Sequence, residues 1–69
     1  MDHKAGKYVF DVSSIPVTSG FQGRIDYRWE DGAETKQSYK IFDKVCLTNV
    51  DAEMHAKAQF ELRVRDDTV

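Results

Sequence analysis

The sequence predicts an α+β fold, in which a three-stranded antiparallel meander sheet packs against one C-terminal helix. Three observations predict it: apolar and polar residues alternate from 21 to 30, a tight-turn signal follows directly, and strong helix formers fill residues 50–64. The 69 residues suffice for one small domain, so we expect a single unit over residues 1–69. Its ends, residues 1–6 and 66–69, are expected to be frayed.

The first predicted strand begins near Tyr8, because Tyr8, Phe10 and Val12 are apolar at alternate positions. We expect it to end before Pro16, because proline donates no hydrogen bond to a sheet ladder. A connecting loop over residues 18–20 follows.

The second strand gives the strongest signal in the chain. Alternation over ten residues is typical of a strand with one buried face and one solvated face. The predicted inward residues are Phe21, Gly23, Ile25, Tyr27 and Trp29, and the outward residues are Gln22, Arg24, Asp26, Arg28 and Glu30.

The Asp31-Gly32 pair predicts a hairpin turn, since these residues tolerate the positive φ values of tight turns. The return strand is expected from about residue 35, with a bulge or strand end where two apolar residues, 41 and 42, adjoin. We assign Tyr39, Ile41, Val45 and Leu47 to the inward face and Lys36, Ser38 and Lys40 to the outward face.

Residues 50–64 fit two structures. Every even position is apolar, which taken alone predicts a fourth strand, but Ala, Glu, Met, Lys, Gln and Leu dominate, and these favour a helix. Thr48 is placed as an N-cap with Asp51 three residues later. Oppositely charged residues also alternate at i, i+4 spacing, at Glu53, Lys57, Glu61 and Arg65. We therefore predict a helix, with its charged residues facing water.

The helix would present two apolar ridges that straddle the sheet. The small alanines should let it approach Tyr27 and Trp29 closely, and His55 and Gln59 should lie partly buried between the ridges. The ridges are Ala52-Ala56-Phe60-Val64 and Met54-Ala58-Leu62.

Composition limits the function classes. The lone Cys46 excludes an intramolecular disulfide and favours a reducing compartment, so we expect a cytoplasmic location. No stretch approaches the roughly 20 apolar residues of a membrane span, and no signal peptide is evident. A net charge of −2 gives no bulk attraction to nucleic acid or anionic lipid.

Residues that could carry chemistry are few and widely spaced. His3, Cys46 and His55 lack metal-ligand spacing, and Cys46 among apolar neighbours reads as an inert core residue. No glycine pattern for phosphate binding occurs. We expect no cofactor, no metal and no enzymatic activity.

The one constellation of interest is basic. Arg24, Arg28, Lys36 and Lys40 are assigned to the outward face of the hairpin, where they could contact nucleic acid or a partner. Acidic residues lie among them, and opposite charges across strands are typical of a solvated sheet face. Nucleic-acid binding is therefore the alternative prediction.

Several segments resemble a group of short bacterial proteins of unknown activity. The resemblance covers most of the chain and implies a strand-strand-strand-helix layout with a threonine-capped, alanine-rich helix. The segments are Tyr8-Val9-Phe10, Gly20–Ile25, Tyr39–Phe42, Leu47-Thr48 and Asp51–Ala56. The order of elements is also similar to the DNA-binding domains of tyrosine recombinases and plant AP2 factors, whose strongly basic sheet face is missing here.

Together these observations predict a small non-enzymatic domain that acts in protein interaction or self-association. The motivation is at least one sheet edge and an amphipathic helix, with no recognisable catalytic pattern.

Overall fold

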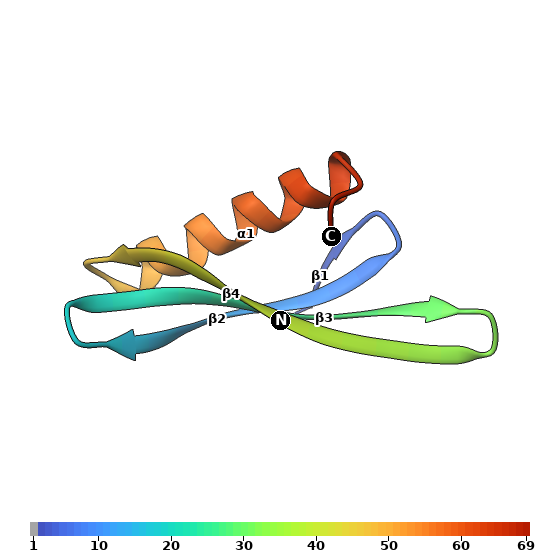
Figure 1. Ribbon diagram of the computed structural model, residues 1–69, viewed down its shortest axis with the longest axis horizontal. Helices are drawn as coiled ribbons and strands as arrows, with labels where there is room; N and C mark the ends of the chain where they lie inside the picture. Colours follow the sequence, from blue (N-terminus) through green and yellow to red (C-terminus); the bar gives the residue numbers. More distant parts are fainter. Residues whose placement is uncertain (1) are drawn as a thin grey trace.

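The computed structural model describes residues 2–69 and contains four strands and one helix in the order β1-β2-β3-β4-α1 (Figure 1). The strands are β1 (His3–Ala5), β2 (Tyr8–Val17), β3 (Gly20–Asp31) and β4 (Glu34–Cys46), and the helix is α1 (Asn49–Arg65). All neighbouring strands are antiparallel, in the spatial order β1-β2-β3-β4. The α+β class and the C-terminal helix are confirmed, but the sheet has four strands and not three.

The additional strand is β1, in a segment that the sequence predicts to be frayed. Its pairing with β2 sets His3 opposite Phe10, and the two rings stack at 5.3 Å between centroids. At the other end, Thr68 donates a backbone hydrogen bond to Arg63, and Val69 packs against the core. Both ends of the described chain therefore contact the rest of the fold.

Strand β2 extends past the end predicted for it. Pro16 lies inside β2, opposite Phe21 of β3. Strand β1 pairs only with Tyr8–Phe10, so the rest of this side of β2 has no neighbouring strand among the described residues. Proline is tolerated in such an edge because its missing N–H can face solvent.

The alternation predicted for β3 is confirmed. Gly23, Ile25 and Tyr27 are buried beneath α1, and the polar residues between them are half-buried on the other face. The hairpin turn is also confirmed, because Asp31 pairs with Glu34 and Gly32 has a φ of +66°. A two-residue turn with glycine at its first central position matches the right-handed twist of the two strands.

Helix α1 is confirmed where a fourth strand was the alternative. The Thr48 hydroxyl accepts a hydrogen bond from the Asp51 backbone N–H at 3.1 Å, as expected of an N-cap. The ridge Ala52-Ala56-Phe60 is fully buried against the sheet. Within the described chain, no helix is long and apolar enough to cross a membrane.

The core lies between α1 and one face of the sheet. It contains Phe10, Ile25, Tyr27, Phe42, Ala56 and Phe60. The Phe60 ring lies 4.7 Å from that of Phe10 and 5.1 Å from that of Tyr27. Cys46 is buried at the end of β4, as predicted for a small core residue.

Helix α1 lies close against the sheet at Gly23, whereas the sequence predicts a close approach over Tyr27 and Trp29. A Cβ built on Gly23 would lie 2.5 Å from the Cβ of Ala56 and would also contact the carbonyl oxygen of Ala52. Glycine in β3 and alanine in α1 are both needed for this spacing. Past Gly23 the aromatic side chains of the core separate the two layers.

Candidate interaction surface

One face of the sheet is not covered by α1 (Figure 1). We call it the outer face and define it by the side chains on the polar side of β3 and by those paired with them on β2 and β4. Antiparallel partners direct their side chains to the same side, so the register assigns each residue to a face. From β2 the outer face receives Val9, Asp11, Ser13, Ile15 and Val17, and from β4 it receives Thr35, Gln37, Tyr39, Ile41 and Val45.

The structure does not bring the four predicted contact residues together on one face. Arg24 and Arg28 lie on the outer face, as predicted from β3. Lys36 pairs with Trp29 and Lys40 pairs with Ile25, so both lysines lie on the helix face of the sheet. The inward assignment of Tyr39 and Ile41 is wrong for the same reason.

The turn explains this reversal of β4. Because Asp31 pairs with Glu34 across a two-residue turn, each later residue of β4 has a fixed partner on β3. Asp26 therefore lies opposite Tyr39, and an aromatic side chain stands on the polar face. The predicted irregularity occurs as a break in register between Gln22 and Arg24, but Val45 and Leu47 are exposed and do not pack inward.

Carboxylates neutralise three of the four cations. The Arg24 guanidinium donates hydrogen bonds of 2.9–3.2 Å to Asp26, and this contact raises the pKa of Arg24. Arg28 donates to Asp2 at 2.9 Å, and Lys36 lies 3.0 Å from Asp31. Paired arginines and lysines release fewer counterions from a nucleic acid, so these contacts weigh against phosphate binding.

A pair of carboxyl groups lies beside Arg28. A hydrogen bond from Asp11 to Asp2 lowers the pKa of Asp2, and the hydrogen bond and charge of Arg28 lower it further. The same hydrogen bond raises the pKa of Asp11, with smaller contributions from burial and from the charge of Asp2. Of the two carboxyl groups, Asp2 therefore has the lower pKa, because it faces the guanidinium.

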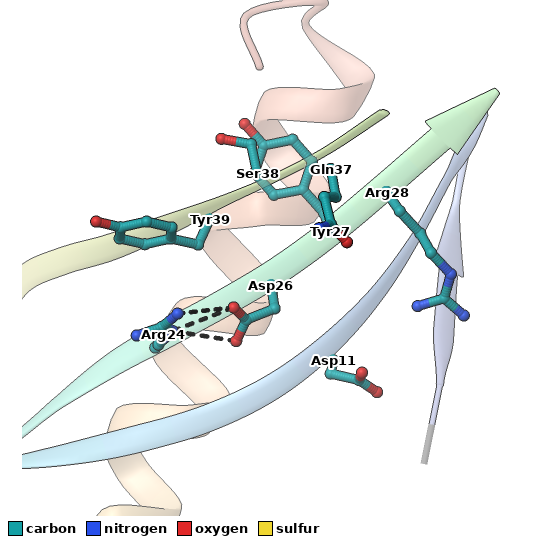
Figure 2. Close-up of a pocket in the computed structure, with 8 residues that line it drawn as sticks. All are labelled: Asp11, Arg24, Asp26, Tyr27, Arg28, Gln37, Ser38 and Tyr39. Carbon is teal, nitrogen blue, oxygen red and sulfur yellow. Dashed lines mark hydrogen bonds and ion pairs between the residues drawn. The ribbon is translucent and has the colours of Figure 1, made fainter. Parts of the chain in front are cut away.

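A hollow of about 460 Å³ lies in the outer face, beside Arg24 and Arg28 (Figure 2). It is lined by Asp11, Arg24, Asp26, Tyr27, Arg28, Gln37, Ser38 and Tyr39. Figure 2 shows Asp26 joined to Arg24, while Arg28 points away from that pair. The Tyr39 ring lies beside Arg24, with its centroid 4.5 Å from the guanidinium carbon.

An exposed apolar row continues from Tyr39 along β4. Tyr39 is 57% exposed, Ile41 41% and Val45 42%. These three side chains lie on the outer face, where no helix covers them. The row was not predicted, because Tyr39, Ile41 and Val45 are apolar and were assigned to the inward face of the strand. Assigning each residue of β4 its partner on β3, starting from the turn at Gly32, would have predicted the exposed row.

A second apolar row lies on α1, where the sequence predicts a ridge against the sheet. Met54 is 65% exposed and Leu62 38%, and Ala58 between them is also exposed. At 3.6 residues per turn, Met54 points about 200° away from Ala52, so one flat sheet cannot bury both ridges. The straddling arrangement predicted for the helix is therefore wrong.

The residues considered for chemistry are dispersed. Cys46 is buried, and His55 is half-buried, with its ring edge-on to Phe42 at 6.2 Å. His3 lies in β1 against Phe10. Among residues 2–69 no group of three or more histidine, cysteine, aspartate or glutamate side chains is placed to hold a metal ion.

Comparison with protein-family models, with curated proteins and with solved structures found no match to this chain.

Proposed function

We propose that this chain is a small non-enzymatic domain that binds another polypeptide through β4 and the adjoining side chains of the outer face. The observation that supports the proposal best is the exposed row of Tyr39, Ile41 and Val45 along a strand that ends the sheet. An edge strand offers unpaired backbone groups for strand addition, and apolar side chains beside it supply buried area.

The chemistry of the row fits protein recognition. Tyrosine and arginine are enriched where protein interfaces carry most of their binding energy, and Tyr39 and Arg24 already lie in contact. Asp26 holds the guanidinium in place, so little side-chain entropy is lost when a partner binds over it. The lone Cys46 suits a reducing compartment, and a cytoplasmic location is part of the proposal.

Nucleic-acid binding through the outer face stays the alternative prediction. Two observations weigh against nucleic-acid binding. Lys36 and Lys40 lie on the opposite face from the two arginines. Carboxylates also face Arg24 and Arg28. Protein binding is therefore the leading proposal.

The test is photo-crosslinking in the cells that express the chain, with a photoreactive phenylalanine analogue in place of Tyr39. The matched control carries the same analogue at Arg65, an exposed position on α1. We expect covalent adducts to a polypeptide from position 39 and none from position 65. If adducts from position 39 do not exceed those from the control, the proposed surface is wrong.

A further inference from the structure

The free edge of β4 has a regular pattern of backbone groups. In an antiparallel ladder, successive residues direct their N–H and C=O groups alternately toward one neighbour and the other. Asp31 and Glu34 close a two-residue turn and face each other, so Glu34, Lys36 and Ser38 direct these groups to β3. The N–H and C=O groups of Thr35, Gln37, Tyr39 and Ile41 therefore point away from the sheet.

This part of β4 is also the least covered part of the fold. Every residue from 34 to 39 is exposed, and the β3–β4 hairpin extends past the region that α1 covers (Figure 1). The last three residues of β3, Trp29–Asp31, have no partner on β2. A two-stranded ribbon in water is only marginally stable, so a further strand beside it would stabilise it.

We propose that β4 pairs with β4 of a second copy of the chain, antiparallel and centred on Gln37, so that two four-stranded sheets join into one. This inference rests on the proposed function and names its partner. In this register Gln37 faces itself, and Thr35 faces Tyr39 of the other copy. All of these residues direct backbone groups to the shared edge.

The charges of β4 select this register. When the pair is centred on Gln37, Glu34 of each copy lies directly opposite Lys40 of the other, giving two attractive pairs related by a twofold axis. Moving the centre to Ser38 sets Lys36 opposite Lys40 twice, which is repulsive. A centre at Tyr39 keeps the backbone pairing and sets Glu34 opposite Lys44, but Lys44 lies in the irregular stretch of β4, residues 42–44, that has no partner on β3.

The register also suits the side chains on the outer face. Tyr39 lies opposite Thr35 of the other copy, and aromatic and β-branched residues are favourable partners across strands. Because the twofold axis passes through the sheet at Gln37, both helices lie on the same side of the joined sheet. Each helix covers the part of its own sheet away from the hairpin tip, which leaves the shared edge open (Figure 1).

The experiment is sedimentation equilibrium over protein concentrations from about 10 μM to 1 mM, a range that brackets weak association. The variants are Glu34→Lys, Lys40→Glu and the double exchange, with Glu61→Lys on α1 as the matched charge control. Circular dichroism verifies that each variant is folded. We expect the wild-type chain to form dimers and each single reversal to weaken the dimer on the order of tenfold, because two pairs turn repulsive. The double variant, Glu34→Lys with Lys40→Glu, should restore wild-type affinity, and the control Glu61→Lys should leave the affinity unchanged.

Two results would overturn the inference. A wild-type chain that stays monomeric through 1 mM excludes this pairing, while adducts between position 39 and a different protein would leave the proposed function standing. If the dissociation constant of the dimer is unchanged by Glu34→Lys and by Lys40→Glu, but increases with Met54→Glu, the contact lies on α1 instead.

Discussion

Replacement of Gly23 by alanine is the most informative perturbation of the fold that presents β4. The added methyl group would lie 2.5 Å from the Cβ of Ala56 and against the carbonyl oxygen of Ala52. Neither neighbour is the end of a flexible side chain, so the helix itself must move. Movement of α1 would loosen its contact with Phe42 and the rest of β4.

The size of the effect follows from two opposing contributions. Overpacking a core site costs about 1–3 kcal/mol. Replacing a strand glycine recovers about 0.5–1 kcal/mol, because glycine loses more conformational freedom on folding. We therefore expect Gly23→Ala to lower the free energy of unfolding by about 1–2 kcal/mol, from the combination of the two. In a domain of this size that loss lowers Tm by about 5–15 °C.

Thermal and urea unfolding followed by circular dichroism measure the change. The control is a double-mutant cycle with Ala56→Gly, which removes one of the two obstructing groups. Gly23→Ala should cost at least about 0.5 kcal/mol less in that background, because the two sites share the same space. An unchanged or higher Tm for Gly23→Ala would show that α1 does not rest on β3 at this position.

Three further outcomes are expected. Thr48→Ala should lower the free energy of unfolding by about 1 kcal/mol through loss of the N-cap, whereas Thr48→Ser should leave it unchanged. Equal urea midpoints for the Thr48→Ala and Thr48→Ser variants would contradict this. Asp11→Ala should raise the pKa of Asp2 toward 3.8 in a carboxyl NMR titration, because the hydrogen bond that contributes most to lowering it is removed; an unshifted titration would disprove the pair. In the wild-type chain, the lowered pKa of Asp2 means that this group stabilises the fold at pH values above its pKa in the unfolded chain, and that this contribution is lost as pH falls through the folded pKa. The raised pKa of Asp11 has the opposite effect, because its contribution to stability is present at low pH and is lost as pH rises through the folded pKa. Fluorescence anisotropy with a labelled DNA duplex at low salt should show no saturable binding, and binding that Arg28→Ala abolishes would favour the nucleic-acid alternative.

The parts of the fold that follow from local patterns were predictable from sequence. Strand β3 has one buried and one polar face, so its period of two is plain in the residues themselves. The turn at Gly32 and the cap at Thr48 depend on residue types with specific backbone roles. Composition, the Thr48 cap and the i, i+4 charge spacing together identified α1 as a helix.

The parts that depend on pairing were not predictable from hydrophobicity. Strand β1 has three residues and no periodic pattern, and its position depends on contact with β2. The faces of β4 follow from register, so Tyr39 and Ile41 were assigned to the core although they are exposed. The prediction of a basic face was wrong for the same reason. A shift of one residue in the register of β4 moves Lys36 and Lys40 from the outer face of the sheet to the helix face.

Residue-resolved amide hydrogen exchange at two protein concentrations tests the central claim most directly. If β4 binds a second strand, protection of the Thr35, Gln37 and Tyr39 amides should rise with concentration, because these N–H groups face the free edge in the monomer. Amides of Lys36 and Ser38, which face β3, should be protected equally at both concentrations and serve as the internal control. Fast exchange of Thr35, Gln37 and Tyr39 at both concentrations would contradict self-pairing through β4.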